Sequence, residues 1–290
     1  MKNLAAAVVP VLTAAVLAGG GPAYAAAPAD PVKSLRKQFA AGLGVRVSEE
    51  NRTVVSGYKG AYPTRTTGVI GFGASSAADY DLTSRVKLSP ELKGTLDKKD
   101  EARLIKPLRA VKVGPRTYVR GFEWGTMPEG KSWVRFQGDS LWGSHGQRGG
   151  QLVDVLDPRV LKAAIAKAAT RKAGEYRGTL TARDLYADPL APTEVRTISY
   201  RLFLNRDQLP VRLVTEYKYT TVGVDLDGKK VKESVHSVTD TRYSGWGTKV
   251  KVVAPPARQV VDFDDLEGPA ATEDLNGPIT LNGPVTTTGS

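Results

Sequence analysis

The strictest constraint on the fold is the alternation of side chains between residues 80 and 88. Tyr80, Leu82, Val86 and Leu88 fall on one face together with Ser84, and charged or polar side chains take the other face. A period of two residues over nine positions predicts a β-strand with one side buried and one side in water.

Other segments carry the same signal less regularly. Apolar and aromatic residues alternate with polar ones over residues 198–204 and again over 211–219, and residues 205–207 have the composition of a turn. Together these segments predict a β-hairpin. Runs bounded by glycine, proline or polar turn residues predict further strands over residues 46–57, 66–73, 108–113, 117–122, 132–136, 232–243 and 248–253.

Only two segments have the spacing of an amphipathic helix. The first follows the Asp30-Pro31 cap and extends to Leu43, with glycines to end it. The second begins at Asp157, carries apolar residues at spacings of three and four, and ends before Gly174. Strands and helices do not alternate as in a parallel sheet, so we expect one α+β domain with an antiparallel sheet.

The chain divides into three parts by composition. Residues 1–25 have a short basic start, an apolar run and the Ala23-Tyr24-Ala25 cleavage pattern, which together predict a secretory signal peptide. Residues 26–257 form the predicted domain. Residues 258–290 are acidic and rich in glycine, proline and threonine, and we expect them to be a disordered tail.

Charge and cysteine content restrict the partners. Without Lys2 of the signal peptide, 40 basic residues face 30 acidic ones, which in an exported protein favours anionic envelope polymers or a membrane surface over nucleic acid. The chain contains no cysteine, so disulfides, thiolate metal ligands and a lipid anchor on cysteine are excluded. We therefore expect a soluble extracytoplasmic monomer.

Four segments in order resemble the LolA and LppX superfamily of exported bacterial lipid and lipoprotein carriers. They are the opening helix, the strands through Gly68-Val69-Ile70-Gly71-Phe72 and 80–88, the Leu156-Asp157-Pro158 helix, and the closing strands. The closing part carries most of the resemblance: Leu209-Pro210-Val211-Arg212, and a last strand ending Val-x-Val-x-Ala-Pro-Pro at 250–256, are similar to actinobacterial members.

The resemblance implies an unclosed, curved β half-barrel whose concave face is covered by helices. It also implies a non-enzymatic carrier or sensor for a lipid, an acyl chain or an acylated protein, with no cofactor. The alternative is an envelope regulator of the RseB kind, which uses the same fold to bind a protein. The expected lining is Ile70, Phe72, Tyr80, Leu82, Val86, Leu88, Ile198, Tyr200, Leu202, Leu204, Val211, Leu213 and Tyr217.

The aromatic and catalytic signals are weaker. Trp124, Trp133 and Trp142 either pack at the rim of the domain or border the mouth of the cavity or a sugar-binding surface. Gly138-Asp139-Ser140-Leu141 spells the GDSL block of secreted esterases, but it lies far from the mature N-terminus and lacks the late Asp-x-x-His that would activate the serine. The two histidines do not make a zinc site, so we expect neither catalytic residues nor a metal.

Overall fold

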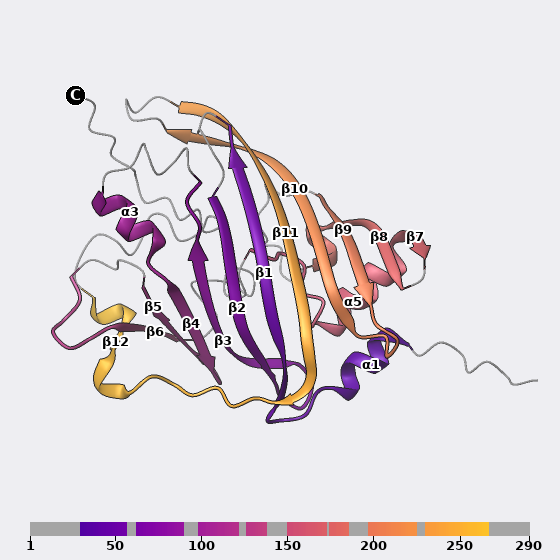
Figure 1. The fold of residues 1–290 in the computed structure, drawn as a ribbon, viewed down its shortest axis with the longest axis horizontal. Coiled ribbons are helices and arrows are strands. Elements are labelled where there is room, and N and C mark those ends of the chain that lie inside the picture. The colour runs from indigo at the N-terminus through magenta and orange to yellow at the C-terminus, as the bar shows by residue number, and fades with distance from the viewer. Residues whose placement is uncertain are drawn as a thin grey trace, which may run out of the picture.

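The structure is a computed structural model that describes residues 30–56, 62–89, 98–121, 126–137, 150–172, 174–185, 197–224 and 230–266. Within these residues, twelve strands form one sheet in the order β12-β6-β5-β4-β3-β2-β1-β11-β10-β9-β8-β7 (Figure 1). Neighbouring strands are antiparallel, apart from β12, which is parallel to β6. The strands are β1 (Leu43–Val55), β2 (Tyr62–Phe72), β3 (Ala77–Val86), β4 (Leu108–Val113), β5 (Arg116–Arg120), β6 (Trp133–Gln137), β7 (Ala168–Lys172), β8 (Glu175–Thr181), β9 (Thr197–Leu204), β10 (Pro210–Val224), β11 (Lys230–Lys249) and β12 (Val260–Asp262).

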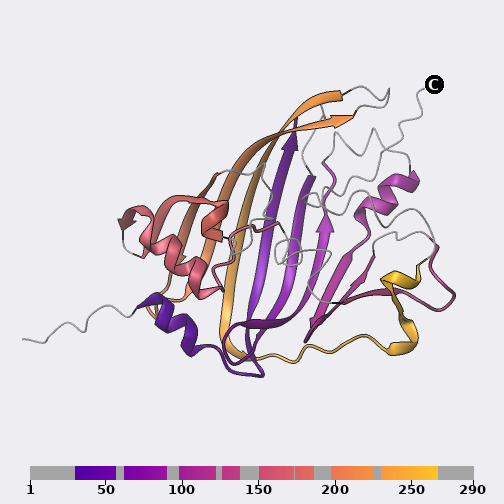
Figure 2. The same cartoon turned by 180° about the vertical axis from the view of Figure 1, so that it is seen from behind.

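The sheet is curved and unclosed, with β12 at one edge and β7 at the other. Its concave side, here called the inner face, carries α1 (Pro31–Lys37) and α5 (Pro158–Ala166) over the β8 to β11 half (Figure 2). Helix α3 (Lys98–Ile105) lies against β3, and α6 (Ala182–Leu185) is a single turn beside α5 and β8. This arrangement confirms the predicted α+β half-barrel with helices on its concave face.

The buried apolar side chains of the inner face form three separate clusters. The largest lies beneath α1 and α5 and includes residues from β1, β2, β3, β9, β10 and the segment 153–156. A second joins β5 and β6 to β12, and a third joins the end of β3 to Leu104 of α3. On the outer, convex face, Trp133 and Tyr118 pack against Val252 and Ala254, so the chain after β11 crosses that face before it pairs as β12.

Both predicted helices are shorter in the structure. Asp30 and Asp157 cap α1 and α5 as expected, because each carboxylate accepts a hydrogen bond from a backbone N–H of the first turn. Helix α1 ends at Lys37. The apolar spacing on which the helix was predicted as far as Leu43 continues through the turn that connects α1 directly to β1. Helix α5 ends at Ala166, and the residues predicted as its last turn form β7.

The C-terminal part also differs from the prediction. The two strands predicted over residues 232–253 form one strand, β11, which ends at Lys249. Gly245 and Gly247 adopt φ values of 63° and 73°, a left-handed geometry that glycine tolerates inside an irregular strand. Residues 258–266, assigned to the tail, contribute to a 3-10 turn (Ala257–Gln259), to β12 and to a second 3-10 turn (Phe263–Asp265). Strand β12 pairs with β6, and the second turn packs against it. The predicted signal peptide lies outside the described residues.

Candidate functional site

The structure brings most of the predicted lining residues to the inner face. Ten of them are buried in the cluster beneath α1 and α5, and they come from both halves of the sheet: Ile70, Phe72, Tyr80, Leu82, Ile198, Tyr200, Leu202, Leu204, Leu213 and Tyr217. The hydroxyl of Tyr200 donates a hydrogen bond to the carbonyl of Ala164, which fixes α5 over β9. Burial raises the pKa of Tyr200 to about 12, so this phenol stays neutral.

The remaining predicted residues lie elsewhere. Val86 and Leu88 pack with Leu104 of α3, and Val211 is half-buried at the start of β10. Trp133 is buried on the outer face, 5.6 Å below the guanidinium of Arg109, so we leave it out of the inner-face site. Trp124 and Trp142 fall outside the described residues.

A band of polar side chains crosses the middle of the inner face, between the apolar ends of the strands. Its central row follows the strand register from Thr241 of β11 through Glu49 and Thr66 to Ser84 of β3. We call the full set the polar band: Glu49, Asn51, Thr53, Thr66, Ser84, Thr215, Ser237, Thr239 and Thr241, with Gln151 lying over it.

Hydrogen bonds link members of the polar band that lie on five strands, β1, β2, β3, β10 and β11. Asn51 Nδ2 donates to Ser237 Oγ and Thr239 Oγ1 at 3.0 and 2.8 Å. Thr66 and Ser84 hydroxyl oxygens lie 2.7 Å apart. Thr215 Oγ1 donates to Gln151 Oε1 at 2.9 Å, which ties the covering segment to β10. Buried polar groups are stable only when bonded in this way, so the polar band is an integral part of the interior.

Glu49 is the only titratable group among the described residues that combines near-complete burial with a place in this band; its exposed fraction is 1%. Its Oε1 accepts a hydrogen bond from the backbone N–H of Gly150 at 2.5 Å, and its Oε2 lies 3.1 Å from Thr241 Oγ1. Burial outweighs these two bonds and raises the pKa of Glu49 to about 7. The side chain is therefore largely protonated in mildly acidic solution and largely charged above neutrality.

A cavity of about 20 Å³ adjoins the Glu49 carboxyl, which is room for one water molecule. Polar and apolar residues both line this cavity. The polar ones are Glu49, Gln151, Asp154 and Thr241, and the others are Val47, Ile70, Val153, Leu156 and Tyr243.

We expect Thr241→Val to lower the free energy of unfolding by roughly 1 to 3 kcal/mol, because this buried hydroxyl serves two partners. Gln151 Nε2 donates to it at 3.1 Å, and it also contacts Glu49. Urea denaturation at neutral pH measures the change. Thr241→Ser keeps the hydroxyl and serves as the control, and equal losses in both variants would show that the methyl group, not the hydroxyl, matters.

The sequence contained a signal for Glu49 that the prediction did not use. In the run Val45, Val47, Glu49, the carboxylate occupies an inward position of an otherwise alternating strand. A charged residue on the apolar phase of a strand marks either a strand end or a buried polar site. The partners of Glu49 on β11 and at Gly150 are more than 100 residues away and could not be assigned.

The described residues contain no catalytic arrangement that matches the weak sequence signals. Ser140 and His145 lie outside them. His236 Nε2 is 2.9 Å from Glu216 Oε1 on the outer face, on the opposite side of the sheet from the polar band. No group of three His, Cys, Asp or Glu residues within the described ranges could hold a metal ion, and no helix there is long and apolar enough to cross a membrane.

No protein-family model and no curated protein matches the chain. Among solved structures it is similar to a LolA superfamily protein from Nitrosomonas europaea, with 12% identity, a TM-score of 0.28 and coverage of 78% of this chain and 93% of that one. It is also similar to a DUF1329 family protein from Desulfovibrio piger (11%, TM-score 0.27, coverage 74% and 92%). A third is a putative outer membrane lipoprotein-sorting protein domain from Vibrio parahaemolyticus (8%, TM-score 0.25, coverage 74% and 89%).

Proposed function

We propose that the chain is an exported, non-enzymatic carrier that holds a lipid, an acyl chain or the lipid part of an acylated protein against the inner face. The observation that supports this most is the division of the inner-face core. A domain usually has one contiguous apolar core and small satellite clusters under its loops, whereas here both smaller clusters include strand residues of the same inner face as the large one.

The three clusters meet around one cross-strand pair, Ser84 of β3 and Leu108 of β4. Leu82 belongs to the large cluster and Val86 to the one beneath α3. Leu108 packs against the cluster that joins β5 and β6 to β12. Ser84 and Leu108 are themselves half-buried. A cargo seated at this junction would touch apolar surface on three sides and the polar band on the fourth, which suits a molecule with an acyl chain and a polar head.

We expect the purified protein to retain acyl-containing molecules at near one per chain, detected by native mass spectrometry and by lipid extraction of the same sample. Ser84→Trp should lower affinity for a fluorescent long-chain fatty acid by at least about tenfold, because the indole would occupy the junction. Thr83→Trp places the same side chain on the outer face and should bind as the wild type does.

Two outcomes would overturn the carrier proposal. Ligand-free wild-type protein that also fails to bind the fatty acid would favour the alternative, a module of the RseB kind that recognises a protein. Equal binding by Ser84→Trp and wild type would show that the acyl chain is held elsewhere. Urea midpoints for both variants separate a loss of binding from a loss of folding.

A further inference from the structure

The outer face of the sheet carries arginines in two neighbouring cross-strand rows, defined by residues that are direct partners in the register. Direct partners in adjacent antiparallel strands project from the same face, at strand spacings of about 4.8 Å. The first row runs Arg177, Arg201, Val214, Asp240, Glu50, Arg65 and Arg85. The second runs Glu175, Phe203, Arg212, Arg242, Ser48, Thr67, Thr83, Arg109 and Arg120.

These rows hold four pairs of arginines that stand directly opposite each other. Like charges in this position destabilise a sheet, so each pair requires a compensating group. The compensation differs from pair to pair. The pairs are Arg177 with Arg201, Arg212 with Arg242, Arg109 with Arg120, and Arg65 with Arg85.

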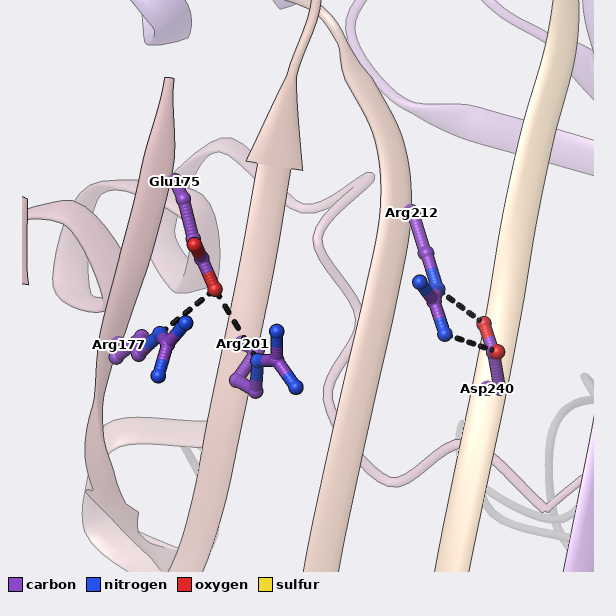
Figure 3. A network of polar contacts seen from close by, with 5 residues as sticks. All are labelled: Glu175, Arg177, Arg201, Arg212 and Asp240. Atoms are coloured by element: carbon purple, nitrogen blue, oxygen red, sulfur yellow. Dashed lines mark hydrogen bonds and ion pairs between the residues drawn. The ribbon is translucent and has the colours of Figure 1, made fainter. Parts of the chain in front are cut away.

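A carboxylate lies beside each of two of these pairs. Figure 3 shows Glu175 bonded to both Arg177 and Arg201, and Asp240 bonded to Arg212. Glu175 Oε1 accepts hydrogen bonds from Arg177 Nε at 2.7 Å and from Arg201 Nε at 3.1 Å. The hydrogen bond from Arg177 is the main reason that the pKa of Glu175 lies below its usual value.

Asp240 plays the same part in the second pair. It accepts two bonds from Arg212, at 2.9 and 2.7 Å, and lies 3.8 Å from Arg242 Nη2. In the third pair, Asp81 takes two bonds from Arg109.

The fourth pair has no such partner. Arg65 and Arg85 are both exposed, and within the described part of the chain neither forms an ion pair, although Glu50 stands opposite Arg65 on β1. The two rows contain eight arginines and three carboxylates. Asp81, which is bonded to Arg109, adds a fourth carboxylate, so this set of residues carries a net charge of +4. Among the described residues, no carboxylate forms a hydrogen bond or ion pair with Arg65 or Arg85, in contrast to the other three pairs.

We propose that the outer face binds a flexible phosphate-bearing polyanion, with Arg65 and Arg85 clamping one phosphate where the other pairs hold a carboxylate. Guanidinium groups form paired, charge-assisted hydrogen bonds with phosphate oxygens. The face is convex, so a flexible polymer can follow both rows, whereas a flat bilayer would touch only the crest. Phe203, the aromatic residue within the rows, is covered by the guanidiniums of Arg201 and Arg212 at 5.4 and 5.6 Å, which leaves its ring unsuited to stack nucleobases. This inference is independent of the carrier proposal.

Inorganic polyphosphate titrated into the full chain, followed by calorimetry at several salt concentrations, tests the proposal. Arg65→Gln with Arg85→Gln should weaken binding by at least about tenfold and reduce the slope of log K against log salt by about two, one for each guanidinium. The matched control is Arg36→Gln with Lys37→Gln, which removes the same charge from exposed positions on α1 and should change binding less than about twofold. All four positions are exposed, so the free energy of unfolding from urea denaturation should stay within about 0.5 kcal/mol of the wild-type value.

Three results would overturn the proposal. One is absence of binding by the wild type. Another is equal weakening in the two double variants, which would mean that only net charge matters. The third is tighter binding to phosphatidylglycerol vesicles than to polyphosphate at equal phosphate, with no binding to phosphatidylcholine vesicles, which would assign the face to a membrane.

Discussion

Replacing Glu49 with glutamine is expected to stabilise the protein by about 3 kcal/mol near pH 8 and by less than about 1 kcal/mol near pH 5. The pKa of Glu49 is about 7 in the folded protein and 4.5 without burial. Between these values the unfolded chain releases a proton that the folded chain keeps. Stability therefore falls as the pH rises through this window, and the loss is complete above the folded pKa. A neutral glutamine at this position does not incur this loss.

Urea denaturation of wild type and Glu49→Gln at both pH values measures this difference. Glu50→Gln is the matched control, because residue 50 is the next one along β1 and is exposed on the outer face. It should change stability by no more than about 0.5 kcal/mol at either pH. A Glu49→Gln variant that is less stable than wild type near pH 8 would mean that the bonds from Gly150 and Thr241 outweigh burial and keep the carboxylate charged.

Replacing Gly68 with alanine is expected to lower the free energy of unfolding by roughly 2 to 4 kcal/mol, because a Cβ atom has no room there. A Cβ built on Gly68 lies 2.0 Å from the backbone carbonyl oxygen of Asp81 on β3. Backbone atoms cannot rotate away as a side chain can. The pairing of β2 with β3 would have to shift at the residue that faces Leu82 on the inner face.

Gly71→Ala is the control for this substitution, since it lies on the same strand and its built Cβ comes no closer than 3.7 Å to any neighbour. We expect it to change stability by less than about 1 kcal/mol. Urea midpoints of the two variants are compared at one pH. Similar losses at both glycines would show that the reduced freedom of the unfolded chain, rather than the contact with Asp81, determines the effect.

The sequence predicted the faces of the strands better than the ends of the elements. Alternation placed Tyr80, Leu82 and Leu202 inward, and each is buried, because a period of two permits only one register against an apolar core. Edge strand β7 was missed since its residues, Ala168–Lys172, are mostly exposed and favour a helix when considered alone. Helix α3 was missed because it joins a buried cluster through a single residue, Leu104, and one buried position gives no periodicity that would indicate a helix.

The apolar part of the candidate site was predictable, but its polar part was not. The apolar side chains and the spacing of residues such as Ile198 and Leu213 indicate that these positions are buried. Threonine and serine on an inward phase give no such signal, because the same residues also occupy solvent-facing strand positions. Thr239 and Ser237 become a site only once β11 lies beside Asn51 of β1.

The register of β1 with β11 also sets the order in which the molecule can fold. Asn51 and Thr239 are 188 residues apart in the chain, yet their strands form the centre of the sheet. Local hairpins such as β9 with β10 can form early, but the two halves of the sheet join only after nearly the whole domain is present. Such long-range closure slows folding. For a chain that we expect to be threaded across a membrane, late closure would keep it extended until it has emerged on the far side.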